Sequence, residues 1–362
     1  IYCDSDADCG KQELCVNGLC EVDRCPGNYA SAPPLGQMIY IEHDREFVVM
    51  DAGKDNGAYW IDAHDKTNGG FSYAFSYKSD DKKPLDIAGG NLYGTRPEAV
   101  AVIYEGDTTI RVFHGDQSKT LQTGILPVAI DAGDVWGQGR DAIVVVSASG
   151  GYAICDAMTE TCVTGQAPVG YTVSDVGVGD VDGDNRGELV FMTKNAAKKH
   201  CLVVENVDAD QTGQTPNMIH TIGDDEPRHL SVGDIDGDGR AEIVGYHDEG
   251  WGNLLHDNLR TFTVDEDGEI TDHGKQSTGD KKMIDIAVSD VNGDGKAEVA
   301  VLLDGNKLRL LSASPTKGQY TWLDTHELTP GNNLQRMTMA DVNSDSAVGE
   351  LEQAENAVLS EE

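Results

Sequence analysis

Short apolar runs separated by turn residues dominate the chain between residues 40 and 345. Typical runs are Glu98 to Tyr104, Thr109 to His114 and Ile143 to Val146, and a Glu-Gly-Asp turn separates the first two. Runs of this length that are rich in valine and isoleucine and bounded by Gly, Asn and Asp are typical of β-strands. The pattern therefore predicts an all-β fold of many short strands joined by tight turns.

An acidic motif follows three of these runs and leads directly into another. It begins at residues 180, 234 and 290, so it recurs after 54 and then 56 residues. The three copies read Asp180-Val-Asp182-Gly-Asp184-Asn-Arg-Gly-Glu188, Asp234-Ile-Asp236-Gly-Asp238-Gly-Arg-Ala-Glu242 and Asp290-Val-Asn292-Gly-Asp294-Gly-Lys-Ala-Glu298. Weaker copies begin at Asn91, Asp134 and Asp341. Between copies we expect about four strands, and a period of about 50 residues with four strands is typical of a β-propeller blade.

Oxygen-bearing side chains at positions 1, 3, 5 and 9 of a tight turn are suitable ligands for a hard cation. Calcium takes about six to eight oxygen ligands, and a Gly or Asn near position 6 permits the sharp bend. A single Asp-Gly-Asp is also common in ordinary surface turns. Three copies, each with the distal Glu in place, favour calcium. The β-like flanks exclude an EF-hand, whose loop lies between helices.

These repeats resemble the FG-GAP or VCBS repeat family, whose propeller blades carry calcium loops of the form D-x-D-x-D-G-x-x-E. The resemblance covers roughly residues 40 to 345 and is specific only in the three strong loops. It implies side-chain ligands at positions 1, 3, 5 and 9 and a carbonyl ligand at position 7. These are Asp180, Asp182, Asp184, Glu188 and the Arg186 carbonyl; Asp234, Asp236, Asp238, Glu242 and the Arg240 carbonyl; and Asp290, Asn292, Asp294, Glu298 and the Lys296 carbonyl.

The weaker loops differ in what they predict. We expect no tight metal site in the loops at Asn91 and Asp134, which have lost most ligands. The loop at 341 offers Asp341, Asn343 and Asp345, but its glutamate lies one residue late. The sequence thus predicts about three calcium ions, and a fourth at the 341 loop stays open.

The anchors predict a propeller of six four-stranded blades, with seven as the alternative. The last loop is followed by too few residues for three more strands. We therefore expect the strand Leu334 to Ala340 to pair with the N-terminal strands Glu46 to Met50, Ala58 to Ala63 and Phe71 to Tyr77, which would remove the open sheet edges.

The cysteines indicate an oxidising compartment and a small N-terminal module. Five of the eight lie in the first 25 residues, a segment with too little apolar content to fold without crosslinks. The spacing has no C-x-x-C pair and no nearby histidine, which disfavours zinc. The predicted pairs are Cys3 with Cys15, Cys9 with Cys20, Cys155 with Cys162, and Cys25 with Cys201. The predicted domains are a disulfide-rich module at 1–26, the propeller at 27–345, and an acidic tail or short helix at 346–362.

Charge and hydropathy restrict the partners. The net charge is −36, from 63 acidic and 27 basic residues, so nucleic acid is an improbable partner because its phosphates would be repelled. No run approaches the ~18 apolar residues that a membrane-spanning helix needs. Because no signal peptide is recognisable at its start, we expect the chain to be a processed or trimmed mature form. These features favour a secreted or cell-surface protein.

No catalytic set is evident in the sequence. There is no G-x-S-x-G or H-E-x-x-H, and the recurrent His-Asp neighbours would point to opposite faces of a strand. The sequence therefore predicts a non-enzymatic, calcium-binding adhesion or recognition module for a protein or glycan, with Trp251 as a weak ligand-binding candidate. Two alternatives stay open: a structural subunit of a cell-surface filament that self-associates, and a polysaccharide lyase or other carbohydrate-active enzyme on a propeller. Such an enzyme should gather Lys, Arg or His at one face.

Overall fold

The protein divides into two compact units, Ile1–Tyr40 and Ile41–Glu362. The computed structural model describes residues 13–16, 19–22, 46–51, 60–67, 70–78 and 82–342, the last range with gaps at 168–169, 208–217, 224–226, 248–256, 266, 278–281, 292–293, 305–306, 315 and 328–333. In the first unit these residues form a hairpin of β1 (Glu13–Val16) and β2 (Leu19–Val22), with Cys15 opposite Cys20 in the register. The two predicted disulfides of this module, and the tail at 346–362, lie outside what is described.

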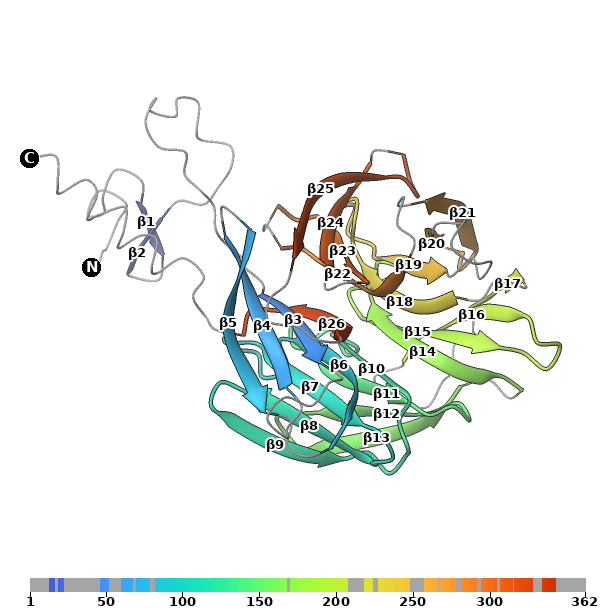
Figure 1. Ribbon diagram of the computed structural model, residues 1–362, viewed down its shortest axis with the longest axis horizontal. Coiled ribbons are helices and arrows are strands. Elements are labelled where there is room, and N and C mark those ends of the chain that lie inside the picture. Colours follow the sequence, from blue (N-terminus) through green and yellow to red (C-terminus); the bar gives the residue numbers. More distant parts are fainter. Residues whose placement is uncertain are drawn as a thin grey trace, which may run out of the picture. The chain divides into compact units, whose positions relative to one another are not determined.

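The described part of the second unit contains six antiparallel sheets of four strands each (Figure 1). Five of them follow chain order: β6 (Pro84–Gly90), β7 (Ala99–Tyr104), β8 (Thr109–His114) and β9 (Gln117–Gln122); β10 (Ala129–Gly133), β11 (Ala142–Val146), β12 (Gly151–Asp156) and β13 (Thr161–Gln166); β14 (Thr172–Gly179), β15 (Glu188–Lys194), β16 (His200–Glu205) and β17 (Met218–Gly223); β18 (Pro227–Gly233), β19 (Glu242–His247), β20 (Asn258–Val264) and β21 (Ile270–Ser277); and β22 (Met283–Ser289), β23 (Glu298–Leu303), β24 (Lys307–Ala313) and β25 (Tyr320–Glu327).

The remaining sheet joins the two ends of the propeller chain. Its strands are β26 (Leu334–Ala340), β3 (Glu46–Asp51), β4 (Trp60–Thr67) and β5 (Gly70–Lys78), in that order. In Figure 1 the red β26 lies beside the blue β3, and the register places Met337 opposite Val49. The predicted closure by the C-terminal strand is therefore confirmed.

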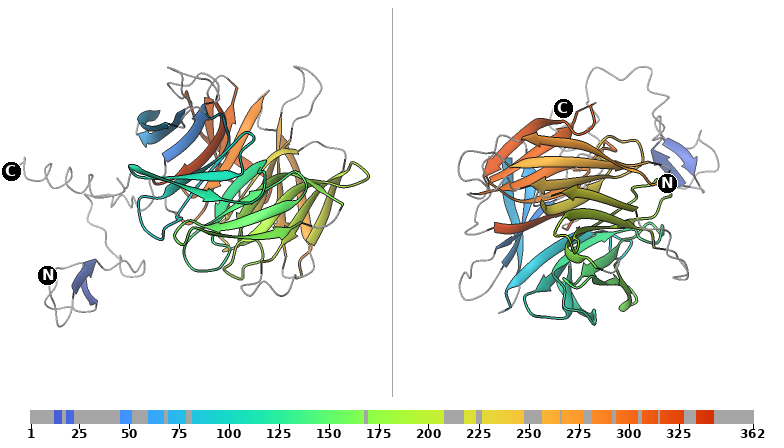
Figure 2. Two further views of the ribbon diagram at one scale, coloured as in Figure 1. Left: turned by 90° about the horizontal axis from the view of Figure 1, so that it is seen from below. Right: turned by 90° about the vertical axis from the view of Figure 1, so that its right-hand side faces the viewer.

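The first strand of each sheet faces a common centre. These inner strands contact one another in a closed cycle of β6, β10, β14, β18, β22 and β26, and β26 contacts β6 again. Figure 2 shows the sheets from two further directions. The prediction of an all-β propeller with four-stranded blades is confirmed. The alternative seventh blade has no counterpart among the described strands.

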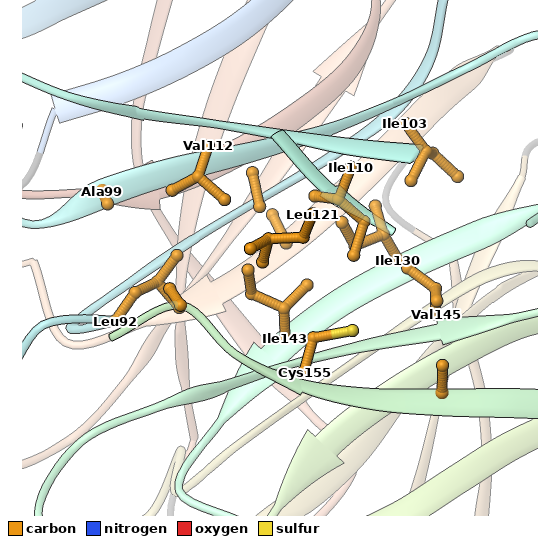
Figure 3. Packing of buried hydrophobic residues seen from close by; sticks show 14 residues of the cluster. Leu92, Ala99, Ile103, Ile110, Val112, Leu121, Ile130, Ile143, Val145 and Cys155 are labelled. Atoms are coloured by element: carbon orange, nitrogen blue, oxygen red, sulfur yellow. The ribbon is translucent and has the colours of Figure 1, made fainter. Parts of the chain in front are cut away.

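Apolar side chains fill the space between neighbouring blades. All six residues of β7 are buried, whereas only Leu121 is buried in the outer strand β9. Ile103 and Ile110 of one blade pack with Ile143 and Val145 of the next, as Figure 3 shows. Burial on both faces explains why the second strands read as continuous apolar runs. The blades are thus held mainly by burial of these side chains.

Candidate functional site

The first acidic loop, between β14 and β15, is ordered by its own first residue. Asp180 Oδ1 accepts hydrogen bonds from the amides of Gly183 at 2.7 Å and Asp184 at 3.0 Å, and Oδ2 accepts one from Asn185 at 2.8 Å. A short acidic side chain that accepts several backbone N–H groups stabilises a tight turn. Asn185 adopts a positive φ of 65°. The loop thus forms because Asp begins it and Asn tolerates its sharpest bend.

Glu188 turns back into the loop from the start of β15. Its Oε2 accepts the amide of Val181 at 2.9 Å, and the residue is almost fully buried. Burial, together with the charge of Asp182, raises the pKa of Glu188 to about 8. A cation in the loop would lower the pKa of Glu188 again, because it stabilises the ionised carboxylate.

Three carboxylates converge in this loop, and one atom of each lies within 4.8 Å of the others: Asp180, Asp182 and Glu188. All the donors are oxygen atoms, which is the ligand chemistry that calcium prefers. Asp184 is in the same loop and accepts the Arg186 amide at 2.9 Å. The donor set therefore fits a hard divalent cation.

The second loop, between β18 and β19, repeats this geometry. Asp234, Asp236 and Glu242 form a group within the same 4.8 Å limit. Asp234 accepts the amides of Gly237, Asp238 and Gly239, and Glu242 accepts the amide of Ile235 at 3.1 Å. Here Lys317 contributes a cation: its Nζ lies 3.0 Å from Asp236 Oδ2, which shows that a positive charge fits this position.

The other loops share the turn but differ in their donors. In the loop after β22, Val291 donates to Glu298 at 3.1 Å and Lys296 donates to Asp294 at 2.9 Å, while Asn292 lies outside the described residues. In the loop after β10, Asp134 alone accepts the amides of Gln138 and Gly139. The loop conformation therefore depends on the first Asp, and the metal ligands are additional to it. Asn343 and Asp345 of the last loop also lie outside the described part of the chain.

Neighbouring loops are tied to one another. The carbonyl of Asp180 accepts the amide of Ala241 at 2.7 Å, and that of Asp234 accepts the amide of Ala297 at 2.7 Å. Asp134 and Gly187 are joined in the same way at 2.8 Å. An ion that fixes the first residue of one loop thus also supports the contact with the next blade.

A second polar site lies where the inner strands meet. A cavity of about 130 Å³ is lined by residues of all six inner strands. The charged or titratable residues that line it are Asp86, Asp131, Asp141, Asp175, His229 and Asp285, and Arg336 lies beside Asp86. Arg336 Nε lies 3.1 Å from Asp86, and His229 Nδ1 lies 3.4 Å from Asp175 and 4.0 Å from Asp285. The centre of the propeller thus combines carboxylates with a histidine and an arginine.

Four of these carboxylates, together with the hydroxyls of Ser231 and Thr338, connect every blade to the next. The acceptor of one inner strand binds a backbone amide of the following strand, in a cycle that closes on itself. The pairs are Asp86 with Ile130, Asp131 with Val178, Asp175 with Leu230, Ser231 with Val288, Asp285 with Met337, and Thr338 with Gly89. These groups therefore have a structural role whatever else they do.

Burial changes the proton affinity of the central carboxyls. It raises the pKa of Asp86 to about 7, against the lowering effect of the Arg336 charge. It raises the pKa of Asp131 to about 8, and it also raises the pKa of Asp285. Carboxyls that exchange a proton near neutral pH are suited to acid–base chemistry.

Sequence reasoning missed this cavity, although a signal was present. Asp86, Asp175, His229, Asp285 and Arg336 each lie five residues before the first residue of an acidic-loop copy. Each also follows a β-bulge in its inner strand, which redirects the side chain. The recurrence of a charged residue five positions before each of these loops, inside an otherwise apolar strand, is the sequence pattern that indicates the cavity.

The disulfide predictions have mixed outcomes. Cys155 and Cys162 form a disulfide between register partners on β12 and β13, as predicted. Cys201 is a buried thiol on β16 with no disulfide partner among the described residues, and its predicted bridge to Cys25 stays a prediction. The strand buries the Cys201 side chain inside its own blade, where Asn195 Nδ2 donates to Sγ at 3.6 Å. Trp251 and Cys25 lie outside the described residues.

Comparisons with known proteins concern only the fold. No protein-family model matches the chain, and no curated protein does. A periplasmic gluconolactonase of Pseudomonas aeruginosa is similar in structure at a TM-score of 0.46 and 15% identity, covering 82% of this chain and 99% of the other. A protein from Lactobacillus plantarum is similar at a TM-score of 0.48 and 14% identity, with the same coverage. Likeness at this level does not transfer an activity.

The prediction that the chain is not an enzyme needs correction. It rested on the lack of a catalytic set in the sequence. The central cavity gathers titratable groups that the linear sequence did not reveal, and such groups can form a catalytic set. The described residues include no helix of the length and apolarity that crossing a bilayer requires.

Proposed function

We propose that this chain is an extracellular calcium-binding β-propeller in which the ions hold neighbouring blades together. The observation that supports this most directly is the convergence of Asp180, Asp182 and Glu188 within 4.8 Å, repeated by Asp234, Asp236 and Glu242. The resemblance of the loops to FG-GAP and VCBS repeats agrees with this proposal. The disulfide between Cys155 and Cys162 supports an oxidising, extracellular compartment.

Calcium would neutralise like charges that the loops bring together. Without a cation, three carboxylates share a small volume and repel one another. At a calcium concentration 100 times the Kd, each site would add about 2.7 kcal/mol to the free energy of unfolding. The loop after β22 is proposed as a third site, with Asp290, Asn292, Asp294 and Glu298 as side-chain ligands. The 341 loop is proposed as a weaker one.

Calcium titration by calorimetry tests the proposal. The Asp182→Ala and Asp236→Ala variants should each lose one site, because each removes a carboxylate from one group. Asp116→Ala, at an exposed turn position, is the matched control and should bind like the parent. Equal stoichiometry in all four proteins would show that these loops do not bind calcium.

A second candidate function is a carbohydrate-active enzyme whose reaction takes place in the central cavity. The observation that favours it is the gathering of His229 with carboxylates in one cavity, where Arg336 pairs with the lining residue Asp86. Asp86, with its pKa raised to about 7 by burial, would act as a proton donor or acceptor, and Arg336 would stabilise a developing negative charge. His229 lies 3.4 Å from Asp175 in the same cavity.

Turnover assays separate this function from a purely structural centre. Polysaccharides, uronate polymers and a sugar lactone would be supplied to the parent and to Asp86→Asn. The variant keeps an acceptor for the Ile130 amide but cannot exchange the proton. Activity that disappears in the variant at an unchanged melting temperature supports the enzyme. Activity on none of these substrates, or activity that the variant retains, rejects it.

Adhesion to a protein or glycan, and self-association into a filament, stay predictions. Their sequence support came from Trp251 and from the two termini, which the structure does not describe. The calcium proposal is independent of which of these roles the protein has.

A further inference from the structure

The second acidic loop contains a cation from the neighbouring blade. Lys317 lies in the turn between β24 and β25, whereas the loop connects β18 and β19. Its Nζ lies 3.0 Å from Asp236 Oδ2, 3.2 Å from Glu242 Oε1 and 3.4 Å from Asp238 Oδ2. The ammonium group therefore uses the same oxygens that a calcium ion would need.

The turn that carries Lys317 is held firmly against the blade of the loop. Gly318 has a φ of 77°, and a Cβ at this position would lie 2.7 Å from His273 Cβ on β21. Tyr320 and Gln276 exchange two hydrogen bonds, with the Tyr320 amide donating at 2.7 Å and the Gln276 amide donating at 3.2 Å. Tyr320 also bonds to Thr261 through its hydroxyl at 2.7 Å. These contacts position the lysine stem before any metal binds.

In the first loop, the Arg240 side chain of the next blade lies against Gly183, but no described cation pairs with the carboxylates themselves. Asp180, Asp182 and Glu188 form no ion pair with a lysine or arginine in the part of the chain that the structure describes. Instead, Asp182 Oδ2 accepts a hydrogen bond from the neutral Asn206 amide at 3.0 Å. Two loops with the same pattern of acidic residues therefore differ in their resident partner.

We propose that Lys317 is an intramolecular competitor of calcium at the second loop, so that this loop binds calcium more weakly than the first. This inference rests on the proposed calcium function. Calcium and an ammonium group cannot bind the same carboxylate oxygens at once, because the two cations would then lie within a few ångströms of each other and repel. Calcium must displace the lysine into solvent. Binding at the second loop then removes one contact between two blades and replaces it with the ion.

Calorimetric calcium titration of Lys317→Gln tests the inference. In the parent we expect a tight and a weak class of sites. In the variant the weak class should tighten about tenfold, which corresponds to the loss of a competing interaction of about 1.4 kcal/mol. In chelator the variant should melt below the parent, because the acidic loop has lost its resident cation, and the difference should shrink in saturating calcium.

Lys282→Gln is the matched control, because it removes the same charge from an exposed pair with Asp304 at 3.4 Å. It should leave both classes of sites unchanged. Equal tightening in both variants would attribute the effect to net charge and overturn the role of Lys317. An unchanged weak class in Lys317→Gln would overturn it as well. If no protein binds calcium, the proposed function itself fails, which is a distinguishable result.

Discussion

Replacing Thr338 by valine removes the hydroxyl that closes the ring of blades. Thr338 Oγ1 accepts the amide of Gly89 at 2.9 Å, across 249 residues of sequence. This bond joins the C-terminal strand β26 to β6, so it is the last of the six acceptor–amide links around the centre. Valine has nearly the same shape as threonine, and the substitution therefore isolates the hydrogen bond from the packing.

The expected loss follows from the environment of the bond. A buried amide left without an acceptor costs about 1–3 kcal/mol, and the partly buried setting here favours the lower half, about 1–2 kcal/mol. In a domain of about 150–250 residues, each kcal/mol of lost stability lowers the melting temperature by about 2–4 °C, and in a larger domain by less. We therefore expect a decrease of a few degrees. Urea unfolding followed by circular dichroism would measure it, provided that the transition is two-state.

Two controls make the result specific. Thr338→Ser keeps an acceptor and should recover most of the loss. Thr172→Val changes the same atoms at an exposed position, where the hydroxyl makes only a long 3.4 Å contact with the Lys194 carbonyl, and should cost little. A Thr338→Val protein as stable as the parent would refute the idea that this link contributes to closure.

Further predictions concern charge and covalent links. Burial raises the pKa of Asp131 from 3.8 to about 8, so its contribution to stability is fully present below the unfolded value and is lost as the pH rises toward the folded value. The melting temperature of the parent should therefore fall between pH 5 and pH 8, and that fall should be smaller in Asp131→Asn. The control Asp116→Asn should show the same fall as the parent. Parallel curves for the two variants would contradict this. The bridge between Cys155 and Cys162 closes only a short loop, since the two cysteines are 7 residues apart. Its reduction should therefore lower the free energy of unfolding by only about 2 kcal/mol. Thermal melting with and without reductant measures this loss. A loss much larger than this would show that the bridge also maintains the register of its blade.

The sequence predicted the parts of the structure that depend on local patterns. The acidic loops were found because each is a continuous stretch whose first Asp folds the turn. The closure by β26 could be inferred from the missing strands after Asp341. The environment of Cys201 could not be predicted, because cysteine counting does not reveal that this side chain is buried inside its own blade.

The central cavity could not be predicted in the same way. Asp86, Asp175 and Asp285 are single charged residues in otherwise apolar strands, separated by more than a whole blade in sequence. Only closure of the ring brings them within reach of His229 and Arg336. The position of Lys317 in the second acidic loop also depends on how two blades pack.

The central claim is that the two acidic loops hold calcium, and anomalous diffraction from a crystal grown in saturating calcium tests it most directly. We expect one anomalous peak among Asp180, Asp182 and Glu188 and another among Asp234, Asp236 and Glu242, with Lys317 displaced from the second. Density for water alone within the first group, at saturating calcium, would show that this loop does not hold calcium.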